Sequence, residues 1–129
     1  MNREIKFRGK TRKDGRWFYG LPAYTSGGEI GVVSGWIDGD FGLYDSLEVI
    51  GKTVSQYTGL KDKNDVEIYD GDILETERGK NMIVSWNEKF ASFSLSRQDW
   101  AFTHWFGESC DPIDCTIIGN IHDNPELVP

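Results

Sequence analysis

The 129-residue sequence contains few of the residues and segments that mark secreted, membrane-spanning or metal-dependent proteins. Its two cysteines cannot form a disulfide framework, and its two histidines leave few candidates for a general base. The start lacks the apolar stretch of a secretory signal, no Asn-x-Ser/Thr acceptor occurs, and no window approaches the roughly 18 consecutive apolar residues of a membrane span. These absences predict a cytoplasmic protein with no membrane contact.

Good helix formers are also scarce. Ala and Leu together number 10, whereas Ile and Val number 18 and the aromatic residues comprise 5 Trp, 5 Tyr and 7 Phe. β-branched and aromatic residues favour strands over helices. Short segments of this kind alternate with turn sequences such as Asp14-Gly15, Asp70-Gly71 and Arg78-Gly79. The sequence therefore predicts a single, mainly β domain over residues 1–129, either barrel-like or a strongly curled antiparallel sheet.

One segment has features of a short helix. Ser96 and Asp99 have the spacing of a capping box, and Gly107 follows as a stop signal. We therefore expect at most one short helix, over about residues 96–106.

Charge is unevenly distributed along the chain. The formal net charge is −7, but residues 1–16 have a net charge of +5 and the remaining residues have a net charge of −12. A basic N-terminal hairpin on an acidic body suits an acidic partner or the acidic face of another copy. The plainer interpretation is that both are solvated faces that keep the protein soluble. The overall acidity argues against a protein that tracks phosphates over a broad surface.

The N-terminal hairpin interleaves basic and aromatic residues. On a small β-barrel, such a face is suited to stacking single-stranded bases. The alternative is that the aromatic side chains lie in the core and that their basic neighbours are solvated. The candidate binding residues are Arg3, Lys6, Arg8, Arg12, Arg16 and Trp17.

Two groups of side chains are candidates for a metal site. The first contains both cysteines and both histidines: His104, Cys110, Cys115 and His122. Their order matches no common zinc finger, and a cysteine in an apolar strand is more simply a small buried hydrophobic residue. The second contains four acidic residues: Asp70, Asp72, Glu75 and Glu77. On a strand these carboxylates diverge to opposite faces, so they are not expected to bind one metal ion together. Because general-base candidates are also few, we predict no metal, no cofactor and no enzymatic activity.

Four blocks of the sequence resemble the YopX family of phage and prophage proteins. They are residues 3–10 (REIKFRGK), 56–64 (QYTGLKDKN), 67–73 (EIYDGDI) and 118–127 (IGNIHDNPEL). Two positions depart from the family pattern: Asn64-Asp65 stands where the family usually has Asn-Gly, and His122-Asp123 stands where members often have Tyr-Glu. The resemblance implies a mostly β phage accessory protein, acting in the host bacterial cytoplasm, with no established activity and no catalytic residues to transfer.

Within these blocks we expect the family-typical residues to be structural: Tyr57, Thr58, Gly59, Tyr69, Gly71, Asp72, Gly119 and Asn120. The leading hypothesis is a non-enzymatic module that forms homo-oligomers and binds a phage or host protein. The first alternative is a single-stranded nucleic-acid-binding β-barrel that uses the basic N-terminal hairpin. The second alternative is a metal-dependent hydrolase.

Overall fold

The structure is a computed structural model, and it describes residues 4–24, 30–34, 45–97, 104–106 and 111–129. It divides into two compact units, Met1–Tyr57 and Thr58–Pro129. The boundary falls within one strand, β5 (Ser55–Lys61), which begins in the first unit and ends in the second. The single-domain organisation that the sequence suggests stays a prediction.

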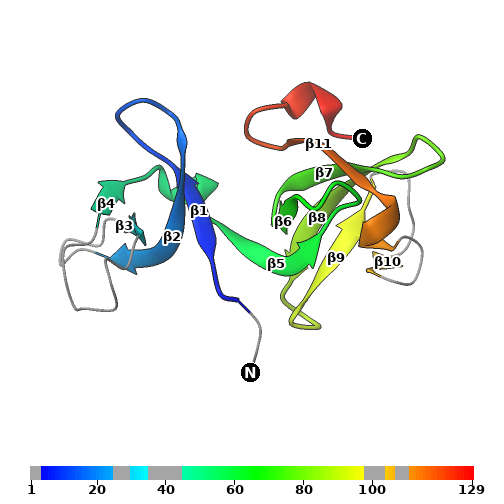
Figure 1. The fold of residues 1–129 in the computed structure, drawn as a ribbon, viewed down its shortest axis with the longest axis horizontal. Helices are drawn as coiled ribbons and strands as arrows, with labels where there is room; N and C mark the ends of the chain where they lie inside the picture. The colour runs from blue at the N-terminus through cyan, green and yellow to red at the C-terminus, as the bar shows by residue number, and fades with distance from the viewer. Residues whose placement is uncertain (1–3, 25–29, 35–44, 98–103, 107–110) are drawn as a thin grey trace. The chain divides into compact units, whose positions relative to one another are not determined.

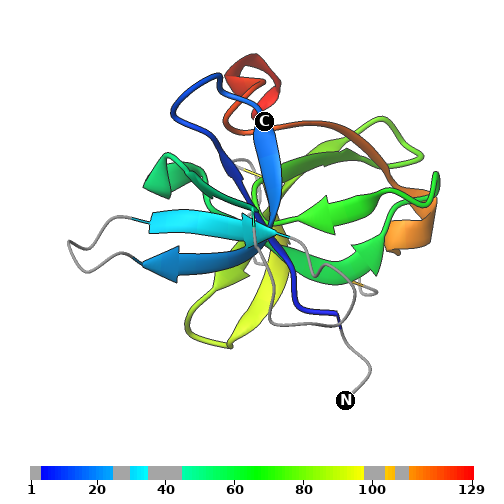
Figure 2. The same cartoon turned by 60° about the vertical axis from the view of Figure 1, so that its left-hand side comes forward.

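The first unit is an antiparallel sheet of short strands (Figure 1). Its strands are β1 (Phe7–Lys10), β2 (Trp17–Tyr24), β3 (Ile30–Ser34), β4 (Asp45–Glu48) and the start of β5, in the order β4-β3-β2-β1-β5. A 3-10 turn, η1 (Gly51–Thr53), precedes β5. Figure 2 shows β2 beside β3, where Leu21 pairs with Val33 in the antiparallel register.

The turn between β1 and β2 follows from its sequence. Gly15 has a φ of +68°, a conformation that glycine adopts without strain. Its backbone N–H donates to the carbonyl of Thr11 over 2.9 Å, and the N–H of Thr11 donates to the carbonyl of Arg16 over 2.9 Å. The Thr11 hydroxyl also donates to the Asp14 carboxylate. The hairpin predicted at Asp14-Gly15 is therefore present.

Gly9 of β1 is closely packed against the interior of the first unit. A Cβ atom at Gly9 would lie 3.0 Å from the side chain of Val49, which is buried. The Thr53 hydroxyl accepts a hydrogen bond from the N–H of Lys10 over 2.9 Å and donates to the carbonyl of Ile50 over 2.6 Å. These contacts attach η1 to the end of β1.

The second unit contains a five-stranded antiparallel sheet in the order β10-β9-β8-β7-β11. Its strands are β7 (Asp72–Glu75), β8 (Asn81–Asn87), β9 (Ser92–Ser96), β10 (His104–Trp105) and β11 (Thr116–Asn120). β6 (Glu67–Tyr69) is hydrogen-bonded to β5. Two 3-10 turns, η2 (Pro112–Asp114) and η3 (Pro125–Leu127), flank β11.

The core of the second unit is a cluster of fully buried side chains. Its members are Ile68, Leu74, Met82, Val84, Leu95 and Cys115. Met82 and Val84 alternate with less buried neighbours along β8, as expected for a strand with one face in the core. Burying one such apolar side chain contributes about 1.5–3 kcal/mol, so the cluster is a major source of stability.

The mainly β fold of antiparallel sheets is confirmed. In the described part of the chain the sheets do not close into a barrel, because each retains two edge strands. The short helix expected at most over about residues 96–106 does not extend to its predicted end, because His104–Trp105 form β10; Ser96, its predicted cap, ends β9. Pairing of β10 with β9 satisfies the backbone there, and this non-local interaction overrides the local capping signal. Residues 98–103 lie outside the described residues.

Candidate binding surfaces

The register of β1 and β2 gathers basic and aromatic side chains on one face of the first unit. Arg8 pairs with Tyr19 and Lys10 pairs with Trp17, and side chains opposite each other in an antiparallel pair share a face. Lys6 precedes Arg8 by two residues and therefore lies on the same side. We call this set, Lys6, Arg8, Lys10, Trp17 and Tyr19, the basic face.

Cations of the basic face lie over its aromatic rings. The guanidinium carbon of Arg8 is 4.3 Å from the centre of the Trp17 ring, and the Lys10 ammonium is 5.6 Å from it. The Lys6 ammonium is 5.8 Å from the centre of the buried Tyr57 ring. Such cation–π contacts are electrostatically favourable, and more so where the cation is desolvated, as Arg8 is at 7% exposure.

The remaining predicted binding residues lie at the turn of the hairpin or outside the described residues. Arg12 and Arg16 are exposed in the turn, and the Arg16 Nε is 3.7 Å from the Asp14 carboxylate. Hydrogen bonds, first from the Thr11 hydroxyl and then from the Arg16 backbone N–H, hold the pKa of Asp14 below its ordinary value of 3.8. Arg3 lies outside the described residues. The structure therefore brings Lys6, Arg8 and Trp17 together and leaves Arg12 and Arg16 at one end.

Two exposed side chains of β2, Tyr19 and Leu21, are not among the predicted binding residues. Tyr19 is 44% exposed and Leu21 is 50% exposed. They follow Trp17 at intervals of two residues, so all three lie on one side of the strand. That alternation is visible in the sequence and is the signal that identifies them.

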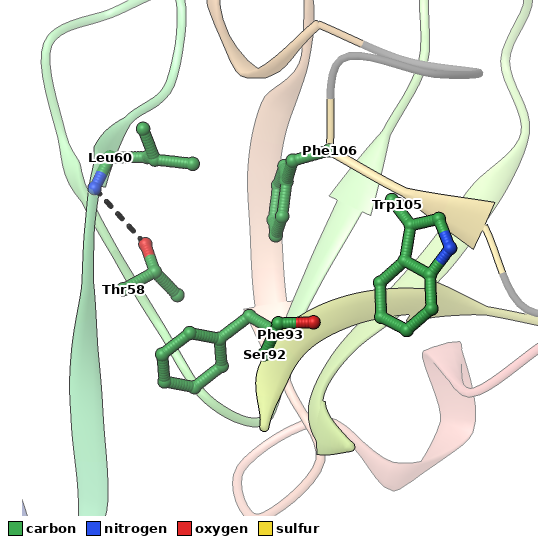
Figure 3. Close-up of a pocket in the computed structure, with 6 residues that line it drawn as sticks. All are labelled: Thr58, Leu60, Ser92, Phe93, Trp105 and Phe106. Carbon is green, nitrogen blue, oxygen red and sulfur yellow. Dashed lines mark hydrogen bonds between the residues drawn. The ribbon is translucent and has the colours of Figure 1, made fainter. Parts of the chain in front are cut away.

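The second unit has a pocket of about 340 Å³ that the sequence did not indicate. Figure 3 shows its lining, with β5 residues on the left, β9 residues below, and Trp105 of β10 and the adjacent Phe106 on the right. The lining residues are Thr58, Leu60, Ser92, Phe93, Trp105 and Phe106. We call this site the aromatic pocket. Its volume lies at the lower end of the range of about 300–1,000 Å³ typical of ligand pockets.

Two further aromatic residues of the β8–β9 hairpin contact the lining. Trp86 pairs with Phe93 across the strands, with ring centroids 5.0 Å apart and an interplanar angle of 71°. Phe90 meets Trp105 edge to face, with centroids 5.4 Å apart and an interplanar angle of 84°. Trp86 and Phe90 are both exposed, so the aromatic surface extends beyond the pocket.

The polar group of Thr58 is already used within the wall of the aromatic pocket. Its hydroxyl donates to the carbonyl of Ile68 over 2.8 Å and accepts a hydrogen bond from the N–H of Leu60 over 3.2 Å (Figure 3). The lining therefore presents mainly apolar atoms, with Ser92 as its other hydroxyl. Such a lining is suited to an apolar side chain rather than to a charged or strongly polar ligand.

Several family-typical residues lie in the turn before β7. The buried carboxylate of Asp72 accepts a hydrogen bond from the N–H of the buried residue Tyr69 over 2.7 Å. The N–H of Gly71 donates to the carbonyl of Val84 over 2.7 Å, and its carbonyl accepts from the N–H of Ile121 over 2.9 Å. This turn therefore joins β6, β7, β8 and the end of β11. Gly59 lies in β5 between the two pocket residues of that strand.

A second group forms the turn after β11. The side-chain oxygen of Asn120 accepts hydrogen bonds from the N–H groups of His122 and Asp123 over 3.0 and 2.9 Å. The N–H of Asn120 donates to the Asn124 side chain over 3.3 Å. A Cβ atom at Gly119 would lie 2.5 Å from that same Asn124 oxygen. These contacts account for a glycine and an asparagine at this turn without invoking a ligand.

Asp62, which the sequence did not single out, holds together the loop between β5 and β6. Its buried carboxylate accepts from the N–H groups of Asn64 over 2.8 Å, Val66 over 3.0 Å and Ile117 over 3.0 Å. Asp65 in the same loop has a φ of +64°, a conformation that favours glycine. The family pattern Asn-Gly fits this backbone better than Asn64-Asp65 does.

The two candidate metal sets are not assembled in the part of the chain that the structure describes. No three His, Cys, Asp or Glu side chains come close enough there to hold an ion. Cys115 is buried, whereas Cys110 lies outside the described residues. Within the same limits, none of the helices is long and apolar enough to cross a membrane.

Comparisons with known proteins support the family resemblance. A family model described as YopX protein matches residues 6–129. The crystal structure of protein EF1440 from Enterococcus faecalis is similar, with a TM-score of 0.61 and 25% sequence identity over 98% of this chain and 99% of that chain. No curated protein matches the sequence. The match over residues 6–129 confirms the resemblance that the four sequence blocks indicate.

Proposed function

The chain belongs to the YopX family, and from its two surfaces we propose that it is a phage or prophage accessory protein that self-associates and binds another protein. It acts without catalysis, in the cytoplasm of the host bacterium. The observation that supports this proposal most directly is the division of charge between the two units. Residues 1–57 have a net charge of +1, and residues 58–129 have a net charge of −8.

The basic residues of the first unit are also concentrated rather than dispersed. The β1–β2 register places Lys6, Arg8 and Lys10 on one face, and Arg12 and Arg16 lie at the turn of the same hairpin. A concentrated positive surface attracts an acidic protein surface and raises its association rate. The acidic second unit of another copy offers such a surface.

Single-stranded nucleic acid is the second candidate partner. The exposed Tyr19 ring opposite Arg8 favours nucleic-acid binding, because proteins that bind single strands usually stack bases on aromatic rings beside cations. The Trp17 ring is less suited to stacking a base, because the Arg8 guanidinium lies over it, 4.3 Å from its centre. The net charge of −7 also opposes phosphate binding. We therefore rank protein binding above nucleic-acid binding.

The test is the molar mass of the protein in solution as a function of concentration and salt. We expect assemblies larger than a single chain at low salt, and partial dissociation near 1 M salt, where the Debye length falls to about 3 Å. A single-chain mass at every concentration would contradict self-association. Tight, salt-sensitive binding of an oligothymidylate by a single chain would favour the nucleic-acid candidate instead.

A further inference from the structure

The aromatic pocket has space for a side chain from outside the second unit. It is open to solvent and has a volume of about 340 Å³, and the hydroxyl of Thr58 is already hydrogen-bonded within its wall. Leu60 in its lining is 39% exposed, and Phe90 beside it is 60% exposed. Exposed aromatic and aliphatic side chains around a pocket are typical of protein interaction sites.

β2 of the first unit presents apolar side chains of the kind that fill such a pocket. Tyr19 and Leu21 project from the same side of the strand, and each is about half exposed. Tyrosine is among the residues enriched at interface centres because its ring is large and its hydroxyl tolerates water. Tyr19 pairs with the cation Arg8 of the same hairpin.

The N-terminal segment and the second unit have opposite net charges. Residues 1–16, which lead into β2, have a net charge of +5, and the aromatic pocket lies in a unit with a net charge of −8. Opposite net charges attract the hairpin of one copy to the second unit of another copy and raise the association rate.

We propose that the aromatic pocket binds Tyr19 and Leu21 from β2 of a second copy of the chain. This inference rests on the proposed self-association and identifies the surfaces that produce it. The two patches differ, so the contact is heterologous: each copy offers one β2 surface and one pocket. One disabled patch therefore leaves the other patch of the same copy able to bind.

The test uses one variant for each patch. Leu21→Asn alters the β2 surface and Leu60→Asn alters the pocket, and neither substitution changes the charge of the chain. Both residues are partly exposed, so the fold is expected to tolerate the changes. Phe90→Asn is a second pocket variant, and Ile113→Asn in η2 is a matched control because Ile113 is an exposed apolar residue outside both patches. Near-ultraviolet circular dichroism verifies that each variant is folded.

We expect each patch variant alone to self-associate at least about tenfold more weakly than the wild type, and the control to be unchanged. An equimolar mixture of Leu21→Asn and Leu60→Asn should form a heterodimer and nothing larger, because only one intact pocket can meet one intact β2 surface. A mixture that stays monomeric would overturn the proposal. Self-association that depends on salt but is unchanged in Leu60→Asn and Phe90→Asn would overturn the pocket assignment alone. A monomeric wild type would overturn the proposed function as well.

Discussion

Arg8 lies directly over Trp17, with the guanidinium carbon 4.3 Å from the centre of the indole ring. The two residues belong to adjacent strands of the N-terminal hairpin, and Arg8 is almost fully buried. Arg8 and Trp17 are both predicted from the sequence to bind a partner, and in the structure they contact each other. Tyr19 and Leu21 of β2 and the two arginines of the turn, Arg12 and Arg16, are exposed side chains of the hairpin that a partner can reach.

The Arg8–Trp17 contact should stabilise the first unit measurably. We expect a double-mutant cycle with Arg8→Met and Trp17→Leu to give a coupling free energy of about 1–2 kcal/mol, because the cation is largely desolvated over the ring. Urea unfolding of the four proteins measures this coupling. Free energies of unfolding that add within about 0.3 kcal/mol would show that the contact contributes nothing specific.

The Asp62 carboxylate should be essential for the loop between β5 and β6. Asp62→Ala leaves the N–H groups of Asn64, Val66 and Ile117 without their acceptor. We expect this variant to lower the free energy of unfolding by about 2–4 kcal/mol, because a buried donor without a partner costs about 1–3 kcal/mol and these three part-buried donors are compensated in part by water. Asp62→Asn keeps one acceptor oxygen, so its free energy of unfolding should fall less than that of Asp62→Ala. Equal losses in the two variants would show that the hydrogen bonds are not the cause.

Gly119 and Asn124 should be coupled by steric contact. A Cβ atom at residue 119 would lie 2.5 Å from the Asn124 side-chain oxygen, so we expect Gly119→Ala to destabilise the wild type by about 2 kcal/mol. In an Asn124→Ala background that oxygen is absent and only the Cβ of residue 124 remains, 3.0 Å away, so the same substitution should cost less. Thermal unfolding of the two single variants and the double variant measures the difference. An equal cost in both backgrounds would contradict this explanation of the glycine.

Asp65→Gly should stabilise the protein even though it deletes a side chain. Asp65 has a φ of +64°, and its carboxylate makes an exposed ion pair with Lys61 over 3.7 Å. Relief of backbone strain should exceed the loss of that pair and raise the free energy of unfolding by about 0.5–1 kcal/mol. Asp65→Val, which suits this backbone poorly, should be destabilising. Chemical denaturation of the two variants checks both signs, and a destabilised glycine variant would contradict the strain argument.

The parts of the fold that the sequence predicts correctly are those that depend on neighbouring residues in the chain. The Asp14-Gly15 turn needs only the positive φ of one glycine, and the buried alternation of Met82 and Val84 follows from strand periodicity. The helix expected at most over about residues 96–106 does not include its last residues, because His104–Trp105 pair with β9, and a capping signal does not encode that pairing.

The binding surfaces show the same division between local and distant information. The basic face follows from the alternate spacing of Lys6, directly before β1, and of Arg8 and Lys10 within β1. The aromatic pocket brings Leu60 of β5 together with Phe93 of β9 and Trp105 of β10, segments that are far apart in the sequence. Asp62 likewise reaches Ile117, which is 55 residues away. Neither feature has a local pattern by which it could be recognised.

The most direct test of the proposed function compares two charge reversals of equal size. Arg12→Glu with Arg16→Glu alters the turn of the basic hairpin, and Arg78→Glu with Lys80→Glu alters the exposed turn between β7 and β8. Sedimentation equilibrium of the wild type and the two double variants gives their association constants at low salt. We predict that the first pair weakens self-association about tenfold and that the second leaves it unchanged or stronger. Equal weakening by both pairs, or no effect of the first, would contradict an interface between the basic hairpin and the acidic second unit.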